Sequence, residues 1–278
     1  MKYLKTIIII LFFSFLFLSC SASTTSFAVI KIQGSDTMLR LTERLAEEYM
    51  TKNPGVSIYV EGGGTASGIR ALINNQVDIC TASRTLQPEE AKLLADYYKS
   101  VGMFYLIAKD ALTIYVNPSN TVDNLTLTDL KKIYTGKITN WQQLGGTDLE
   151  ILPIIRNPNS GTHIYFKEHV LGGDDYLESV ESVATTSDMI DEVLSYTNAI
   201  GYGGIVYDTE AKAVKIDGIA PSEDNSRNDK YPITRYLHFF TTNTPRGEVK
   251  NFIDWSLSAE GQRIVKLQGF IPLFGVSY

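Results

Sequence analysis

Residues 56–73 read VSIYVEGGGTASGIRALI, and this stretch decides the fold class. Its first six residues, Val56–Glu61, alternate apolar and polar side chains as a half-buried strand does. A glycine-rich turn follows at Gly62–Gly68, after which residues 69–73 carry apolar side chains at helical spacing. The order strand, glycine turn, helix is typical of α/β proteins in which crossover helices join parallel strands.

The same order recurs on both sides of this stretch. Val29–Gln33 predicts a strand and Gly34–Thr37 (GSDT) a turn, and a helix follows over residues 38–52 until Asn53–Gly55 ends it. Later segments predict strands over 77–82, 106–116, 151–155 and 236–240, and helices that begin near Pro88 and after Thr162 or that span 187–197 and 249–257. Gly201–Gly204 (GYGG) is interpreted as the end of the third of these helices. A chain of 278 residues has room for two α/β units of this kind.

Residues 1–28 are predicted to be an export signal and a tether. A lysine-bearing start precedes an apolar run over residues 7–18, which is too short for a membrane span of about 20 residues. Two processing sites compete: Ser26–Ala28 offers the small residues of ordinary cleavage, whereas Phe17–Cys20 (FLSC) resembles a bacterial lipobox that would attach lipid to Cys20. We therefore expect an exported protein of the periplasm or cell surface, anchored to the membrane through Cys20 in the second case.

Composition and charge argue against several classes of function. The chain is 44% hydrophobic and 20% charged, as globular proteins are. Its formal net charge is −6, and −8 without the first 19 residues, which argues against a nucleic-acid partner because that affinity comes from Lys and Arg. Cys80 is the only cysteine besides Cys20, and the three histidines are too scattered for metal-ligand spacing. We expect no metal and no other cofactor.

Three short segments place hydroxyls and glycines where a predicted strand turns into a helix: residues 34–37, 62–68 and 160–162. A helix N-terminus presents unpaired amides and partial positive charge, so an anion binds there readily. Arg84 and Arg156 each follow a predicted strand, and arginine supplies a fork of donors suited to a tetrahedral oxyanion. Any one segment alone also fits ordinary N-capping. Together with the two arginines, the three segments predict an oxyanion site.

A hydrolytic site is the alternative from a different class. Ser160 has His163 three residues later, but nothing in the sequence places a carboxylate to orient the histidine. Gly62–Gly68 is followed by no Lys-Ser/Thr pair of a P-loop and lacks the spacing of a dinucleotide-binding fingerprint. We therefore expect no enzyme, and a secreted phosphatase or esterase that uses Ser160 and His163 remains the alternative.

The motifs, taken in order, resemble those of the phosphate-binding proteins of bacterial phosphate ABC transporters, in their shorter lipoprotein-type branch. Four of them occur in this order: Gly34–Thr37 (GSDT), Gly62–Ile69 (GGGTASGI), Val77–Ile79 (VDI) with Ala82–Arg84 (ASR), and Arg156–Thr162 (RNPNSGT). Three further segments fit the same family: Lys109–Asp110, Tyr134–Trp141 (YTGKITNW) and Gly261–Gln262. The resemblance covers the chain from about residue 29 onward.

This resemblance implies a periplasmic-binding-protein fold of type II, in which two α/β lobes close on one oxyanion. The expected lobes are residues 29–109 with 216–278, and residues 110–215. The residues implied to bind phosphate are Ser35, Thr37, the backbone N–H of Met38, Thr65, Arg84, Arg156, Ser160, Gly161 and Thr162. The resemblance also implies a monomeric receptor that delivers phosphate to the permease of an ABC transporter.

Position 84 departs from the family pattern. Larger family members carry an aspartate here that accepts the proton of bound phosphate, whereas this chain has Arg84. Because arginine only donates, we expect affinity to rise with pH through the second ionisation of phosphate, and discrimination against sulfate to be weak. Four alternatives stay open: Arg84 pairs with an acid such as Asp78, Asp36 accepts the proton, the ligand is sulfate or molybdate, or the protein is a surface sensor or adhesin that has lost transport.

Overall fold

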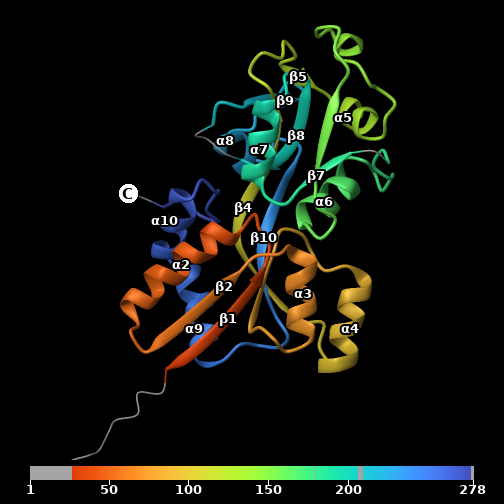
Figure 1. Ribbon diagram of the computed structural model, residues 1–278. Coiled ribbons are helices and arrows are strands. Elements are labelled where there is room, and N and C mark those ends of the chain that lie inside the picture. Colours follow the sequence, from red (N-terminus) through yellow and green to blue (C-terminus); the bar gives the residue numbers. More distant parts are fainter. Residues whose placement is uncertain (1–26, 179, 206–208, 277–278) are drawn as a thin grey trace, which may run out of the picture.

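Two lobes form the opposite ends of the molecule. The computed structural model describes residues 27–178, 180–205 and 209–276. Figure 1 shows that both ends of the chain, coloured red to orange and blue, build one lobe, whereas the middle of the chain builds the other. Among the described residues, no helix has the length and apolar character needed to cross a membrane.

A parallel group of strands forms the sheet of the first lobe. β1 (Ala28–Gly34) lies between β2 (Val56–Glu61) and β3 (Ile79–Ala82) and pairs in parallel with both. Leu41 of the helix after β1 is fully buried and packs in one core with Ile32 of β1. The helices of this lobe are α2 (Leu39–Lys52), α3 (Thr65–Ile73), α4 (Pro88–Tyr98), α9 (Gly247–Ser256) and α10 (Ala259–Leu267). The strand–turn–helix order predicted for residues 56–73 is therefore confirmed.

The second lobe is built around β8 (Ala199–Gly204). This strand pairs in parallel with β6 (Leu152–Arg156), which in turn pairs in parallel with β7 (Glu181–Val183). The other elements of the lobe are β5 (Asn124–Leu125), β9 (Lys212–Ile216), α5 (Leu127–Tyr134), the 3-10 helix η1 (Trp141–Leu144), α6 (Gly161–His169), α7 (Thr186–Ser195) and α8 (Glu223–Arg227).

The segment Gly201–Gly204 is a strand, so its interpretation as the end of a helix is wrong. All six residues of β8 are buried. A Cβ on Gly201 would lie 2.2 Å from Sδ of Met189, and one on Gly203 would lie 2.7 Å from Cγ2 of Thr186. Met189 and Thr186 belong to α7, so the glycines here let a helix pack directly on the strand.

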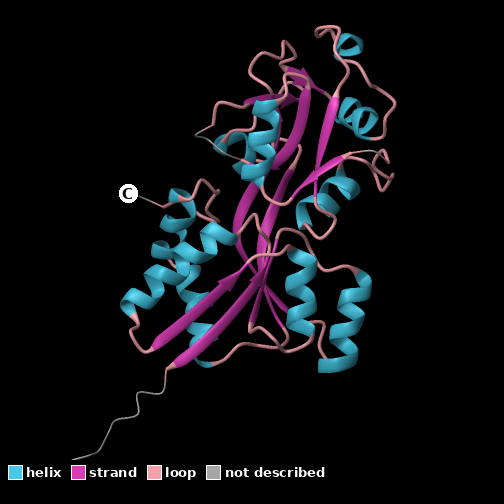
Figure 2. Ribbon diagram, in the orientation of Figure 1, coloured by secondary structure: helices cyan, strands magenta, loops and turns pink. Residues whose placement is uncertain are grey.

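The long strand β4 (Met103–Val116) runs through both lobes, with β10 (Thr234–Thr241) beside it (Figure 2). β4 pairs with β10 up to Ala111 and with β8 from Leu112 onward. The strand order of the whole sheet is β2-β1-β3-β10-β4-β8-β6-β7. One mixed sheet therefore continues from lobe to lobe, and the first crossing lies beside the boundary expected after residue 109.

The chain returns to the first lobe close to β10. Tyr231 and Ile233 are buried in the apolar core of the second lobe, whereas Leu237 is buried in that of the first. The return that we expected after residue 215 stays a prediction, and this packing favours a return after Ile233. The two α/β lobes that the resemblance implied are confirmed, and the structure adds that one sheet continues through both.

Candidate functional site

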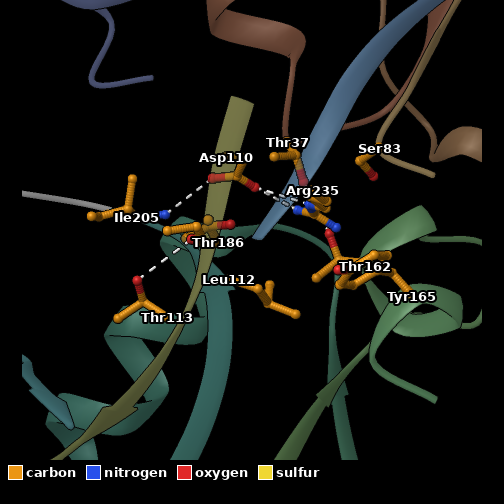
Figure 3. Close-up of polar contacts among 12 residues, drawn as sticks. Thr37, Ser83, Asp110, Leu112, Thr113, Thr162, Tyr165, Thr186, Ile205 and Arg235 are labelled. Atoms are coloured by element: carbon orange, nitrogen blue, oxygen red, sulfur yellow. Dashed lines mark hydrogen bonds and ion pairs between the residues drawn. The ribbon is translucent and has the colours of Figure 1, made fainter. Parts of the chain in front are cut away.

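The three turns that carry glycines and hydroxyls meet where the lobes face each other. Thr37 follows β1 of the first lobe, Thr162 lies in the first turn of α6 of the second, and their Oγ1 atoms are 3.1 Å apart. The backbone N–H of Ala66 donates to the carbonyl of Asn159 across the same boundary at 3.2 Å. Figure 3 shows Thr37 and Thr162 on facing elements. The structure thus brings segments 34–37, 62–68 and 160–162 together.

Two glycines allow this close approach of the lobes. A Cβ on Gly161 would lie 2.5 Å from both the Oγ of Ser83 and the Oγ1 of Thr65, and one on Gly64 would lie 2.6 Å from the carbonyl oxygen of Asn159. Gly64 also has φ +89°, a backbone conformation that favours glycine. Thr65 is held in turn, because its Oγ1 accepts from the backbone N–H of Ser83 at 3.2 Å. At Gly64 and Gly161, therefore, the backbone of one lobe lies directly against atoms of the other lobe.

In the second lobe, the N-terminus of α6 points into this boundary. Ser160 is the N-cap, and its Oγ accepts from the backbone N–H of Thr162 at 3.1 Å. Both side chains are buried. The partial positive charge of a helix N-terminus, with hydroxyl donors beside it, is an arrangement that binds an anion.

Arg156 is a fully buried cation at the end of β6. Its Nη1 donates to the Oγ1 of Thr186 at 3.4 Å and its Nη2 to the carbonyl of Ala184. Within the described part of the chain, its Nε has no hydrogen-bond partner and its guanidinium no ion pair. Burial lowers the pKa of Arg156 to about 10, and the nearby charge of Arg235 acts in the same direction, whereas the charges of Asp36 and Asp188 oppose the shift. An anion at this point would relieve both costs.

Arg235 of β10 is a second buried cation, and the sequence analysis did not single it out. Its Nε and Nη2 donate to Oδ2 of Asp110 at 3.0 and 2.8 Å, and its Nη1 has no partner among the described residues. Its guanidinium carbon lies 5.6 Å from the centre of the Tyr165 ring. Figure 3 shows Arg235 between Asp110 and Thr162. Arg235 thus joins Arg156 at the boundary between the lobes.

Arg84 is paired within its own lobe. Nη1 and Nη2 donate to Oε2 and Oε1 of Glu90, both at 2.7 Å, and Nη1 also donates to the carbonyl of Thr85 at 2.8 Å. Glu90 belongs to the capping box of α4 and accepts from the backbone N–H of Gln87 at 2.8 Å. This two-pronged pair neutralises Arg84, whereas its buried Nε has no hydrogen-bond partner among the described residues. The contact expected between Arg84 and the ligand stays a prediction. The acid involved is Glu90 and not Asp78.

The turn before α2 uses most of its polar groups internally. The backbone N–H of Ser35 donates to the carbonyl of Thr81 at 3.0 Å, and that of Met38 donates to the carbonyl of Ser35 at 3.0 Å. The Met38 amide, expected to contact the ligand, is therefore engaged within the turn. Asp36 accepts from the backbone N–H of Gly63 at 2.8 Å and so ties this turn to the glycine-rich turn.

Ser160 and His163 do not form a nucleophile–base pair. Nδ1 of His163 lies 2.8 Å from the carbonyl oxygen of Arg156, and its ring packs against Tyr176. Burial lowers the pKa of His163. These contacts give His163 a supporting place behind Arg156. Across residues 27–276, apart from 179 and 206–208, no group of three or more His, Cys, Asp or Glu side chains could hold a metal ion.

Comparison with known proteins gives the same family along most of the chain. Residues 21–260 match the model of the PBP superfamily domain. The chain is 33% identical over 251 residues to the phosphate-binding protein PstS of Bacillus subtilis, a match that covers 88% of this chain and 80% of the relative. It is 30% identical over 263 residues to the phosphate-binding protein PstS of Pseudomonas aeruginosa, covering 86% and 81%.

Solved structures agree with this assignment. A substrate-binding protein from Clostridium perfringens with bound phosphate has a TM-score of 0.81 at 32% identity, over 88% of this chain and all of the other. An ABC-type phosphate transport receptor from Vibrio cholerae has a TM-score of 0.74 at 31% identity, over 87% of this chain and 99% of the other. The chain therefore belongs to the PBP superfamily and, within it, to the phosphate-binding proteins of bacterial ABC transporters.

Proposed function

We propose that this protein is an extracytoplasmic receptor that captures one inorganic phosphate between its lobes and delivers it to the permease of an ABC transporter. The observation that supports this most is Arg156, a fully buried guanidinium without an acidic partner among the described residues. A buried cation without a direct ion pair is costly, and an oxyanion bound against it supplies that pair. The similarity to phosphate-binding relatives supports phosphate as that oxyanion.

The donors proposed for phosphate come from both lobes. Nε of Arg156 and Nη1 of Arg235 have no other partner within the described residues, and the hydroxyls of Thr37 and Thr162 lie at the same boundary. Charge-assisted hydrogen bonds contribute about 1.5–3 kcal/mol each. Six to eight of them would supply about 9–24 kcal/mol before the cost of desolvation and closure is subtracted, against the roughly 8 kcal/mol of micromolar binding. The four donors named here are therefore part of the set that such binding needs.

Titration calorimetry with phosphate, arsenate, sulfate and molybdate tests the proposal. Phosphate and arsenate share shape and protonation, so we expect both to bind and to raise the melting temperature. No heat and no thermal shift at millimolar phosphate would contradict phosphate binding. Tighter binding of sulfate or molybdate would instead favour a receptor for that oxyanion.

Attachment to the membrane through a lipid on Cys20 is part of the proposal, together with a monomeric state. Cys20 lies outside the described residues, so this part is supported by the sequence. Metabolic labelling with a fatty-acid analogue should tag the wild-type protein and not Cys20→Ser. Equal labelling of both, or a mature N-terminus at Val29, would favour ordinary cleavage. Light scattering of the purified protein checks the monomer.

A further inference from the structure

A closed ring of hydrogen bonds lies behind Arg156. The backbone N–H of Arg156 donates to the phenol oxygen of Tyr202 at 3.4 Å, and Nδ1 of His163 lies 2.8 Å from the carbonyl oxygen of Arg156. The phenol oxygens of Tyr202 and Tyr176 are 2.8 Å apart, and the Tyr176 hydroxyl donates to the carbonyl of His163 at 3.0 Å. The path from one residue to the next thus returns to Arg156, where it began.

We propose that His163, Tyr176 and Tyr202 are positioning residues, which hold Arg156 and the N-terminus of α6 in one fixed arrangement. The inference rests on the proposed function. Arg156 ends β6, Tyr202 lies in β8 and His163 in the first turn of α6, so the ring is built within the second lobe (Figure 1). The second-lobe half of the proposed phosphate site is therefore formed before the lobes close on a ligand.

The direction of every bond in the ring can be assigned. A backbone N–H only donates, a carbonyl only accepts, and each phenol has one proton to donate. Tyr176 donates its proton to the carbonyl of His163, so the proton between the two phenols comes from Tyr202. Nδ1 of His163 must carry a proton to donate to the carbonyl of Arg156, which leaves Nε2 of the neutral imidazole without one. Burial lowers the pKa of His163 and so favours this neutral form.

Aromatic packing holds the phenols of the ring in place. The Tyr202 ring stacks on that of Phe166 with centroids 4.0 Å apart and an interplanar angle of 8°, and the edge-on Tyr134 ring lies at 5.4 Å. The Tyr176 ring packs against that of His163 at 4.5 Å. Burial raises the pKa of both Tyr176 and Tyr202, so both phenols keep the proton that the ring requires.

The ring orders the two parts of the second lobe that are proposed to meet phosphate. It holds the backbone of Arg156 at its N–H and carbonyl, while Thr186 and Ala184 hold the side chain and leave Nε as the proposed donor. His163 follows Thr162 directly, so the same ring fixes the first turn of α6 relative to Arg156. Donors that are already ordered lose less conformational entropy when a ligand binds. An opened ring should therefore weaken phosphate binding, although no group proposed to touch phosphate is removed.

The first test is spectroscopic and needs no ligand. Nitrogen NMR of protein with isotope-labelled histidine should show His163 at pH 7 with its proton on Nδ1 and none on Nε2. The signal is assigned by its loss in His163→Asn. A proton on Nε2, or an even mixture of the two tautomers, would overturn the ring whatever the protein binds.

The second test opens the ring while keeping its aromatic rings. Tyr202→Phe and Tyr176→Phe should each raise the Kd for phosphate about three- to tenfold, the range that one hydrogen bond represents. Tyr98→Phe is the matched control, because the Tyr98 hydroxyl also donates to a carbonyl, that of Ile73 at 2.8 Å, but does so in the first lobe. It should keep the wild-type Kd. Folded Tyr202→Phe and Tyr176→Phe proteins that bind phosphate as the wild type does contradict the inference.

The third test separates positioning from a general loss of packing. Asparagine carries an amide N–H at the same bond separation from the backbone as Nδ1, so His163→Asn should stay within about twofold of the wild-type Kd. His163→Leu fills similar space without a donor and should lose about three- to tenfold. Equal Kd values in the two variants would overturn the inference.

The outcomes also separate this inference from the proposed function. Wild-type protein that binds no phosphate contradicts the proposed function, whereas the tautomer of His163 decides on the ring itself. Melting temperatures without ligand establish that each variant is folded. A variant with a lower melting temperature and an unchanged Kd would assign the ring to stability alone and so overturn the inference.

Discussion

Arg156 and Arg235 are both buried cations at the boundary between the lobes, yet only Arg156 could be proposed as a site residue from the sequence. Arg156 lies four residues before Ser160 in a single motif, so local spacing indicates its role. Arg235 is one charged residue in the apolar strand β10, and its partner Asp110 is 125 residues away in the chain. Asp110 and Arg235 come together only through the pairing of β4 with β10, which sequence spacing does not show. The charge of Arg235 within an otherwise apolar strand was the only sequence signal that this residue has a special role.

Arg84 shows what motif spacing leaves open. Its motif has the family spacing, so its position in the chain was informative, but spacing does not determine which way a long side chain points. Glu90, six residues later in the first turn of α4, offers both carboxylate oxygens at 2.7 Å. This local two-pronged ion pair holds both terminal nitrogens of Arg84 within its own lobe.

Arg156→Ala should weaken phosphate binding by more than about tenfold, or about 1.4 kcal/mol, because it removes a buried cation that faces the ligand. Arg156→Lys should bind phosphate more tightly than Arg156→Ala but more weakly than the wild-type protein, because an ammonium cannot contact Thr186, Ala184 and the ligand together. Calorimetry gives both dissociation constants. An unchanged constant in folded Arg156→Ala protein would remove Arg156 from the site.

Arg84→Met should change phosphate affinity less than about threefold, because the guanidinium is already paired with Glu90. The free energy of unfolding should fall by about 1–3 kcal/mol, since a partly buried carboxylate loses its partner. Adding Glu90→Gln should recover part of that loss. A folded Arg84→Met protein that loses phosphate affinity tenfold would put Arg84 back among the ligand contacts.

At the scale of elements, strands with alternating apolar and polar side chains were predicted correctly, whereas the glycine-rich strand β8 was not. β1 and β2 carry an apolar pattern that indicates strands, and the helices after them end at recognisable residues. β8 has the sequence AIGYGG, whose three glycines suggest a turn. Its glycines are explained by α7, which packs so closely that a Cβ on Gly201 would meet Met189. The sequence of β8 alone does not reveal that α7 packs against it, so the reason for its glycines could not be predicted.

The strand β10 makes the stability of the protein depend on pH through His238. Burial lowers its pKa from 6.5 to about 4. As pH falls, the unfolded chain binds the proton first, so stability that is present above about 6.5 is lost progressively down to about 4. Urea unfolding should show a loss of about 2 kcal/mol between pH 7 and pH 5 from this group. His238→Gln should remove most of that loss.

His169→Gln, a change of an exposed histidine on α6, is the matched control and should keep the wild-type loss. The pKa of His163 is also lowered by burial, so a smaller dependence on pH should remain in His238→Gln. If the wild-type protein and His238→Gln lose equal stability between pH 7 and pH 5, the dependence arises elsewhere.

At the scale of the whole molecule, two lobes could be predicted, but the way they fit together could not. Chain length and the repeated strand–turn–helix order indicated two α/β units. The fit depends on contacts such as that of Thr37 with Thr162, which lie 125 residues apart. It also depends on Gly64 and Gly161, where one lobe touches the backbone of the other. Gly64 and Gly161 could each be explained by local helix capping, but the structure shows that the close contact with the opposite lobe requires them.

Gly161→Ala should therefore prevent closure while leaving each lobe intact. The new Cβ would lie 2.5 Å from oxygens of Ser83 and Thr65, both in the other lobe and both held by a hydrogen bond between them. Phosphate affinity should fall by more than about tenfold, because closure must now displace packed groups. Small-angle X-ray scattering should show that phosphate contracts the wild-type protein and not this variant.

Gly55→Ala is the control for this prediction, because its Cβ would have nothing within 4 Å. It should keep both the contraction and the affinity of the wild-type protein. The melting temperature of Gly161→Ala without ligand should stay near that of the wild-type protein, since the clash arises only between lobes. A Gly161→Ala protein that contracts with phosphate and binds it with the wild-type Kd would show that the ligand is bound without the close fit of α6 against Thr65 and Ser83.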